Sequence, residues 1–396
     1  MKITAIICEY NPFTNGHLKH IKLAKEQTNA DTIICIMSGS FTQRGDAAIL
    51  DKYQRSYIAC RYGADMVIEL PLIYAISPAE NFAYGAVKIL HDLPKIDFLS
   101  FGSECGDKDL LIKTNNLFEN EPEEFKKLLK DFLAEGYSYP RAKSCALQEF
   151  CKLNKEYEDI QDILEKPNNV LGLSYIKAIK TFNMDIGIHT IKRNEDYNNE
   201  ELTNDFPSAS SIRVALEQNK LDKIKNSIPQ LTYDYLSSYN LRGTSLGDLC
   251  LFKLKDINGH DLANYYDFNA GLNNRLKMAS LNATTFDEFL TNAKSKNITM
   301  TRLKRLSLYT LFDITKDMYK EICDSPTFVS ILAINKERKE LISWVGTTCK
   351  NILTKYSDID RIDKSLRQIV KLDLKAQGCL SIINRTNYYN KSMLLV

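Results

Sequence analysis

The first 105 residues alternate between short apolar runs and stretches with the spacing of amphipathic helices. This alternation restricts the possible folds more than any other feature of the chain. The runs typical of buried strands are Ile3–Cys8, Thr32–Met37, Met66–Glu69 and Phe98–Phe101. Helical spacing occurs between them, over Gly16–Gln27, Asp51–Tyr62 and Ala79–Leu90. Because strands joined through helices pair in parallel with right-handed crossovers, the pattern predicts an α/β fold with a parallel sheet.

Three further segments continue this pattern. Residues 106–165 carry many charges and no strand signal, so we expect a helical insertion there. A helix over Asn169–Lys180 and an alternating strand over Asp185–Lys192 return to the α/β pattern. Ser208 or Ser210 is then a suitable N-cap for a helix that runs through Glu217.

From about residue 223 onward the sequence is mainly helical. Short strands are expected only near 327–334 and 378–384. We therefore expect an α/β domain at 1–220, which includes the insertion at about 106–165, and a mainly helical domain at 221–396.

The composition is that of an ordinary globular protein, with 44% hydrophobic and 26% charged residues. No apolar run approaches the ~18 residues of a membrane span, and the N-terminus lacks a signal-peptide pattern. The ten cysteines are scattered without a C-x-x-C pair, which favours reduced thiols over disulfides or a Cys/His metal site. We therefore expect a cytoplasmic protein with no membrane segment and no protein-held metal.

The charge is unevenly distributed. The whole chain has a net charge of +2, but residues 301–396 carry 17 Lys and Arg against 10 Asp and Glu. A basic C-terminal part favours a polyanionic partner such as nucleic acid. A solvated helical surface explains the same excess nearly as well.

The first predicted strand leads into Thr14-Asn15-Gly16-His17 at the start of the first predicted helix. The free N–H groups of a helix start, together with roughly half a positive charge from the helix dipole, favour an anion. Gly16 leaves room for a nucleotide, and His17 and His20 lie one turn apart as donors to phosphate. Ordinary turn and helix-start chemistry accounts for the same residues without any ligand.

Other polar loops follow the ends of the predicted strands. Arg44 lies in a loop with two glycines, Gly102 ends the fourth strand, and Arg193 follows the fifth. Ser210 and Arg213 belong to the next helix start, which suits phosphate. Each loop alone is explained as a turn or a cap. Because the carboxyl ends of parallel strands share one edge, the loops together predict a nucleotide site there.

Basic residues also gather in two helical segments of the C-terminal part. These are Arg275 and Lys277 in the first, and Arg302, Lys304 and Arg305 in the second, where Tyr309 shares the face of Arg305. Basic and aromatic side chains on one helix suit phosphate contact and base stacking, so we expect RNA binding. A solvated basic helix is nearly as good an explanation.

Taken in order, several motifs resemble the bacterial tRNA(Met) cytidine acetate ligases, a branch of the nucleotidyltransferase superfamily with an (H/T)-x-G-H signature. The similar segments span residues 9 to 305: they are 9–17, 38–46, 101–104, 167–172, 192–193, 208–213, 271–275 and 302–305. The resemblance implies a Rossmann-like nucleotidyltransferase domain followed by a mainly helical, tRNA-binding C-terminal domain. It also implies that ATP and acetate form acetyl-adenylate, whose acetyl group passes to N4 of the wobble cytidine of elongator tRNA(Met).

The resemblance also implies which residues act. The catalytic residues would be His17, Thr14, Arg44 and Arg193, with Mg²⁺ on the substrate phosphates and no protein partner. Thr14 stands where the family usually has His, and Ser40 where it usually has Asn; related nucleotidyltransferases use Thr at the first position. The ATP site would comprise Ile7, Cys8, Glu9, Tyr10, Asn11, Pro12, Phe13, Thr14, Asn15, Gly16, His17, Leu18, Lys19, His20, Gly102, Asn168, Asn169, Arg193, Asn194, Ser210 and Arg213.

Two other functions fit parts of the sequence. One is an adenylyltransferase that joins AMP to a small phosphorylated metabolite, although such an enzyme has little use for a basic helical C-terminus. The other is a non-catalytic RNA-binding protein with a degenerate nucleotide site, which Thr14 allows. Acetate-dependent exchange between ATP and pyrophosphate would separate the ligase from both.

Overall fold

A parallel sheet forms the centre of the molecule, as the alternating pattern predicts. The structure is a computed structural model and describes residues 1–193, 208–238, 245–269, 271–388 and 391–396. Five strands pair in parallel in the order β5-β4-β1-β2-β3. Their bounds are β1 Ile3–Cys8, β2 Thr32–Ser38, β3 Met66–Leu70, β4 Phe98–Ser103 and β5 Gly187–Lys192. The expected α/β fold and all five expected strands are confirmed.

The strand order reverses at β1. The chain adds β2 and β3 on one side of β1 and then crosses over to add β4 and β5 on the other. The carboxyl ends of β1 and β4 therefore leave a crevice between helices that run to opposite faces of the sheet. Open α/β sheets bind their ligands in such a crevice.

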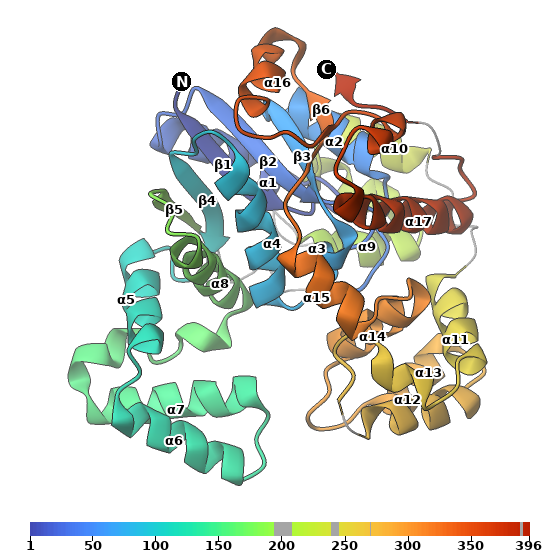
Figure 1. Cartoon of the computed structure of the whole chain (residues 1–396). Coiled ribbons are helices and arrows are strands. Elements are labelled where there is room, and N and C mark those ends of the chain that lie inside the picture. Colours follow the sequence, from blue (N-terminus) through green and yellow to red (C-terminus); the bar gives the residue numbers. More distant parts are fainter. Residues whose placement is uncertain (194–207, 239–244, 270, 389–390) are drawn as a thin grey trace.

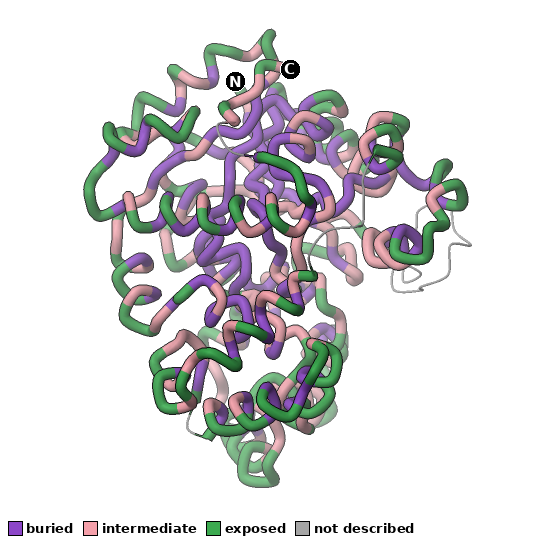
Figure 2. Tube along the Cα trace, turned by 90° about the vertical axis from the view of Figure 1, so that its right-hand side faces the viewer, coloured by how far each residue is buried: buried purple, intermediate pink, exposed green. Residues whose placement is uncertain are grey.

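Helices cover both faces of the sheet (Figure 1). Because successive side chains of a strand point to opposite faces, Ile6 and Ile7 of β1 pack into two different clusters. One cluster includes α1 Asn15–Gln27, α2 Lys52–Arg61 and α9 Ala209–Glu217. The other includes α3 Leu72–Ala75, α4 Ala79–Asp92 and α8 Pro167–Thr181. The buried residues form a continuous band through the middle of the molecule (Figure 2).

The predicted insertion is helical. It contains α5 Lys108–Glu119, α6 Glu123–Ala134 and α7 Tyr139–Leu153, and short 3-10 turns lead from α7 to α8. α6 and α7 lie side by side, below the sheet in Figure 1. Phe125 of α6 and Phe150 of α7 meet edge to face, with ring centroids 5.9 Å apart.

The chain after residue 221 begins as a helical region. α10 Gln230–Ser237 lies near α2, and the next four helices pack on one another. They are α11 Leu246–Asp256, α12 Leu272–Leu281, α13 Phe286–Ala293 and α14 Met300–Leu311. α15 Lys316–Asp324 follows them.

The last seventy residues return to the sheet. β6 Val329–Ile334 pairs antiparallel with β3, and β7 Ile352–Leu353 and β8 Leu394–Leu395 pair with β6. α16 Glu340–Val345 and α17 Arg367–Asn384 lie between these strands in sequence. The strand expected near 327–334 is confirmed. The strand expected near 378–384 is wrong, because that segment is the end of α17, whose apolar residues pack at helical spacing.

The pairing of β6 with β3 crosses the domain boundary that we expected at residue 220. A segment more than 230 residues after β3 completes the same sheet, so 221–396 contains both the helical region and part of the α/β layer. The pairing depends on hydrogen bonds between distant segments, which a local pattern does not record. Among the described residues, no helix is both long and apolar enough to cross a bilayer.

Candidate active site

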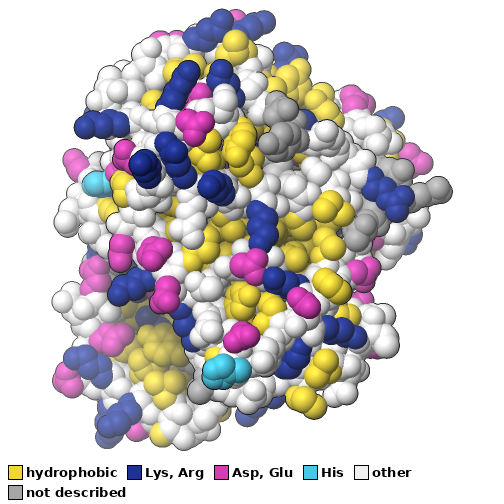
Figure 3. Space-filling model, turned by 45° about the vertical axis from the view of Figure 1, so that its right-hand side comes forward, with side chains coloured by type: hydrophobic (Ala, Val, Ile, Leu, Met, Phe, Trp, Pro, Cys, Tyr) yellow, Lys and Arg dark blue, Asp and Glu magenta, His cyan; other side chains and the backbone are white. Residues whose placement is uncertain are grey.

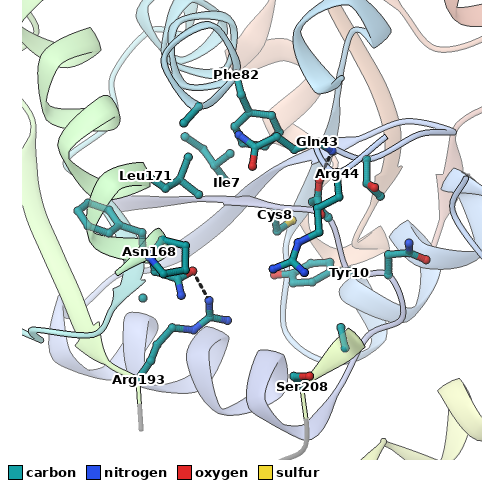
Figure 4. A pocket seen from close by; sticks show the side chains of 18 of the residues that line it. Ile7, Cys8, Tyr10, Gln43, Arg44, Phe82, Asn168, Leu171, Arg193 and Ser208 are labelled. Atoms are coloured by element: carbon teal, nitrogen blue, oxygen red, sulfur yellow. Dashed lines mark hydrogen bonds between the residues drawn. The ribbon is translucent and has the colours of Figure 1, made fainter. Parts of the chain in front are cut away.

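A cavity of about 530 Å³ opens at the carboxyl ends of β1 and β4. Figure 4 shows Arg44 and Arg193 reaching toward its middle from different elements, and Ile7, Phe82 and Leu171 gathered at another end. One part of the wall is therefore rich in cations and hydrogen-bond donors, and another is apolar. Such a division suits a ligand with both phosphates and a ring or methyl group.

His17 is held by the start of its own helix. The Thr14 hydroxyl accepts from the His17 backbone N–H (3.3 Å), and the Thr14 N–H donates to His17 Nδ1 (3.0 Å). Because Nδ1 acts as an acceptor, the ring proton of the neutral form is on Nε2. His17 lines the cavity and thus offers one N–H donor beside the free N–H groups of α1.

Both histidines of the motif are neutral in the free protein. Burial, followed by the positive charge of Arg193 and the proximity of His20, lowers the pKa of His17 to about 3. Burial, with Arg193 and His189, does the same for His20, whose pKa is also about 3. In the neutral state His17 can donate from Nε2 to an anion, and the charge of a bound anion would raise the pKa values of both histidines.

A chain of hydrogen bonds fixes the ring of His20. His20 Nε2 lies 3.0 Å from Ser100 Oγ, Ser100 Oγ lies 2.9 Å from His189 Nδ1, and His189 Nε2 lies 2.9 Å from Gln27 Oε1. Gln27 Oε1 can only accept, so His189 carries its proton on Nε2. His189 Nδ1 then accepts from Ser100, and Ser100 accepts from His20 Nε2. This chain of hydrogen bonds could not be predicted from the sequence, because its members come from α1, β4 and β5.

Glu104, Asn168 and Arg193 join β4, α8 and the end of β5. The Glu104 carboxylate accepts from the backbone N–H groups of Asn168 (3.2 Å) and Asn169 (2.9 Å), and from Asn168 Nδ2 (2.7 Å). Asn168 Oδ1 in turn accepts from the Arg193 guanidinium. Glu104 thereby occupies the start of α8 with a negative charge, where the helix dipole favours it.

Gly102 allows a close approach between β4 and the residue that follows β5. A Cβ built at this position would lie 2.8 Å from Cδ of Arg193. The glycine therefore makes room for the Arg193 side chain to cross the backbone of β4. The close approach is between two parts of this chain, and Gly102 also lines the cavity.

Arg44, Ser210 and Arg213 form another side of the cavity. Arg213 donates to the backbone oxygen of Asn11 (2.8 Å) and to Ser210 Oγ (2.9 Å), and Arg44 donates to the same hydroxyl (3.4 Å). Burial lowers the pKa of Arg213, which remains a cation at neutral pH. Two guanidinium groups thus meet at one serine at the start of α9.

Arg55 supports the floor of the cavity from beneath. Its fully buried guanidinium donates to the backbone oxygens of Glu9, Ser38, Gly39 and Leu50. Burial lowers its pKa to about 10. The four bonds tie the carboxyl ends of β1 and β2 together, and nothing in the sequence distinguished Arg55 from a surface arginine on α2.

Thirteen of the predicted ATP-site and catalytic residues line the cavity. They are Ile7, Cys8, Glu9, Tyr10, Asn11, His17, His20, Arg44, Gly102, Asn168, Arg193, Ser210 and Arg213. The cavity is also lined by residues that we had not expected in an ATP site, among them Gln43, Pro78, Phe82, Leu171 and Tyr175, and by Arg305. The sequence did not distinguish Phe82, Leu171 and Tyr175, because they lie on helices whose periodicity indicated only buried faces. Gln43 and Pro78 lie outside the helices, and Arg305 was expected to bind RNA.

The other predicted ATP-site residues do not line the cavity. Thr14 and Phe13 are fully buried; the first caps α1, and the second packs against Tyr10 and Tyr62. Asn169 Oδ1 accepts from the N–H groups of residues 104 and 105, and Asn15 Nδ2 donates to the Asn226 carbonyl. Pro12, Gly16, Leu18 and Lys19 are also absent from the lining, and Asn194 lies outside the described residues.

The basic residues expected to bind RNA make contacts within the protein. Arg275 donates to the carbonyls of Ala293 and Lys294, and Lys277 donates to three carbonyls at the end of α11. Arg302 forms a two-bond ion pair with Asp267. These side chains join the helices of this region to one another. Such contacts link positions that are distant in the sequence, so the local pattern of charges does not predict them.

Lys304 and Arg305 join α14 to the loop that follows β2. Lys304 Nζ lies 2.8 Å from Asp46 Oδ1, and Arg305 donates to the backbone oxygen of Gln43 (3.3 Å). A hollow of about 490 Å³ lies beside this contact and shares Arg44, Ser210 and Arg213 with the main cavity. In Figure 3, Lys and Arg side chains are mixed with Asp and Glu over the visible face.

A parallel sheet with its cavity at the switch point, a histidine at the helix start after β1 and converging arginines define an α/β protein of the nucleotidyltransferase class. A family model described as HIGH Nucleotidyl Transferase matches residues 1–393. The crystal structure of Thermotoga maritima TmcAL bound with alpha-thio ATP is similar with a TM-score of 0.89 and 29% identity, over 100% of both chains.

Relatives named tRNA(Met) cytidine acetate ligase are similar over most of their length. One from Clostridium perfringens (strain SM101) is 35% identical over 408 residues, which cover 100% of this chain and 98% of the relative. One from Thermoanaerobacter sp. (strain X514) is 39% identical over 347 residues, with 86% and 85% covered. The chain therefore belongs to the HIGH nucleotidyltransferase family and, within it, to the family of tRNA(Met) cytidine acetate ligases.

Proposed function

We propose that this protein activates acetate with ATP and transfers the acetyl group to N4 of the wobble cytidine of elongator tRNA(Met). The observation that carries the proposal is the cavity itself, where a neutral histidine donor, a helix start and several arginines surround one space. The close relatives with this named activity supply the choice of acetate and tRNA. Among adenylate-forming reactions, the cavity chemistry alone would fit several acids.

The first step would join acetate to AMP. An acetate oxygen attacks the α-phosphorus of ATP, the bond to the β-phosphate oxygen breaks, and pyrophosphate leaves. His17 Nε2, the α1 start, Arg193 and Arg213 are the groups that would stabilise the charge on the phosphates. Removal of one such donor costs about 10²–10³ in rate in comparable sites.

ATP would enter as its Mg²⁺ complex. Among the described residues, no group of three His, Cys, Asp or Glu side chains could hold a metal ion by itself. Mg²⁺ that accompanies a nucleotide is held largely by phosphate oxygens and water, so a dedicated cage of side chains is not required.

The anticodon loop would approach through the hollow next to the main cavity. The hollow opens between the loop after β2, α9 and α14, and Arg44 and Lys304 line it. A single-stranded loop exposes the edge of its bases, which suits recognition in such a groove. The role of three other basic residues would be to stabilise this helical region, because they already form hydrogen bonds within it. They are Arg302, Arg275 and Lys277.

The test is to incubate purified elongator tRNA(Met) with the protein, ATP, Mg²⁺ and labelled acetate, and to analyse its cytidines by mass spectrometry. We expect labelled N4-acetylcytidine with the wild-type protein and at least a hundredfold less with His17→Ala. Lys152→Ala, at an exposed ion pair on α7, is the matched control and should behave like the wild type. A wild-type protein that binds ATP and exchanges pyrophosphate without acetate would instead be an adenylyltransferase for another acceptor.

A further inference from the structure

The second step of the proposed reaction releases a proton that some group must accept. The N4 amine of cytidine attacks the acetyl carbonyl carbon, a C–N bond forms, and the bond from that carbon to the AMP phosphate oxygen breaks. AMP leaves with the electron pair, and the amine loses one proton. Because the N4 amine is a poor nucleophile, a positioned base that takes this proton would accelerate the step. The following inference rests on the proposed function.

Most ionisable groups in the cavity wall cannot be this base. Burial raises the pKa values of Cys8, Tyr10 and Tyr175 well above their usual range, so all three remain protonated. The Glu104 carboxylate already accepts three hydrogen bonds from the start of α8. The arginines and Lys166 are donors.

The two histidines of the wall already form hydrogen bonds within the protein. His17 Nδ1 accepts from the Thr14 N–H, and its Nε2 carries the proton. His20 donates through Nε2 to Ser100 in the chain that ends at Gln27. With pKa values of about 3, both are weak bases in the free protein.

Glu9 is different. It lies directly after β1 in the wall of the cavity, and only one hydrogen bond to its carboxylate is found among the described residues: Oε1 accepts from the Gln43 backbone N–H (2.7 Å). Burial raises its pKa, although backbone and arginine groups oppose this effect. The charged and titratable groups that face it are Arg44, Arg55, Arg213 and Tyr175.

Two donors near Glu9 lack partners. Gln43 Nε2 and Arg305 Nε are buried in the same wall, and neither has a hydrogen-bond partner among the described residues. An unpaired buried donor costs free energy unless a ligand or water supplies the acceptor. A cytosine ring presents acceptors at O2 and N3 next to its N4 amine, so it could satisfy such donors while the amine approaches the carboxylate.

We propose that Glu9 is the general base of acetyl transfer, and that Gln43 and Arg305 hold the acceptor edge of the cytosine beside it. The carboxylate takes the amine proton as the C–N bond forms and later releases it to water. Glu9 has no part in the attack of acetate on ATP, which consumes no proton. Its loss should therefore separate the two steps.

The experiment measures the two half-reactions of Glu9→Gln separately. Acetate-dependent exchange of pyrophosphate into ATP should fall far less than transfer does, and circular dichroism checks that the variant folds. Single-turnover transfer from preformed acetyl-adenylate to tRNA should fall by about 10²–10⁴, the usual contribution of a general base. The wild-type transfer rate should rise with pH through the titration of Glu9, and the variant should lose this dependence.

Glu104→Gln is the matched control, because it alters another carboxylate of the same wall. It should weaken ATP binding and exchange, while transfer from preformed acetyl-adenylate keeps the wild-type pH profile. The proposal is overturned if Glu9→Gln transfers acetyl at the wild-type rate, or if it loses exchange and transfer in parallel. If the wild-type protein itself forms no N4-acetylcytidine, the proposed function fails, which is a different outcome.

Discussion

His17 and His20 show how strongly the fold changes single residues. Both are partly buried beside Arg193, and both have pKa values near 3 in the free protein. A histidine in an unfolded chain titrates near 6.5. As pH falls through 6.5, the unfolded state therefore binds protons that the folded state does not.

This difference predicts the pH dependence of stability. The free energy of unfolding should be highest above about pH 6.5 and should decrease as the pH falls toward 3, by at most ~1.4 kcal/mol per pH unit for each proton. Urea unfolding of the free protein between pH 7.5 and 5.5 measures the slope, and His20→Gln should make it shallower. Saturating ATP should also reduce the slope, because the phosphates raise both pKa values. Equal slopes in the wild type and variant would contradict the expected pKa of His20.

Three elements, α2, β3 and α17, meet at a buried charged cluster. Lys52 of α2 lies 2.7 Å from both carboxylate oxygens of Glu69 in β3, and both side chains are buried. Asp373 of α17 accepts from the Leu72 N–H (2.6 Å), and burial next to Glu69 raises its pKa well above its usual range. One lysine therefore lies beside two buried acidic groups, Glu69, which it contacts directly, and Asp373.

Removal of the lysine charge should weaken the packing of all three elements. Lys52→Met leaves Glu69 buried without a counter-charge, which typically costs about 3–5 kcal/mol of the free energy of unfolding. Chemical denaturation measures the loss. Lys152→Met removes an exposed ion pair and serves as the control, with no measurable change expected. If the two variants have similar denaturation midpoints, the prediction is wrong and solvent reaches the Glu69 carboxylate.

The C-terminal segment covers the β3 edge of the parallel sheet. β6 covers the edge of β3, β8 pairs with β6, and α17 packs near α3. The helical region of α11–α14 is inserted between the first five strands and this return (Figure 1). The α/β layer is therefore complete only when residues near both ends of the chain have come together.

A fragment of residues 1–220 should consequently fail to fold as an independent domain. It exposes the edge of β3 and the surface that α17 covers, both of which favour aggregation. Circular dichroism during thermal unfolding should show no cooperative transition for the fragment, in contrast to the full chain. Co-expression with residues 221–396 should restore a soluble complex that binds ATP. A fragment that melts cooperatively and binds ATP alone would support the division at residue 220.

Features that depend on near neighbours in the chain could be predicted from the sequence. The alternation of apolar runs predicted five strands and the helices between them, because side-chain period and capping are local properties. The ends of those strands also located the cavity, since parallel strands bring their carboxyl ends to one edge. His17, Arg193 and Arg213 could be named in advance for that reason.

The contacts of individual polar groups, in contrast, depend on the tertiary fold. Arg305 was expected on an RNA-binding surface, yet it lines the cavity and bonds to Gln43, 262 residues away. Thr14 was expected among the catalytic residues, and its hydroxyl instead caps α1 with the side chain fully buried. β6 was expected in a separate domain, yet it completes the first sheet. In each case the position of the group depends on which partner binds its charge, its hydroxyl or its strand edge. That partner is chosen by the free energy of the pairing in the folded protein, which the local sequence does not reveal.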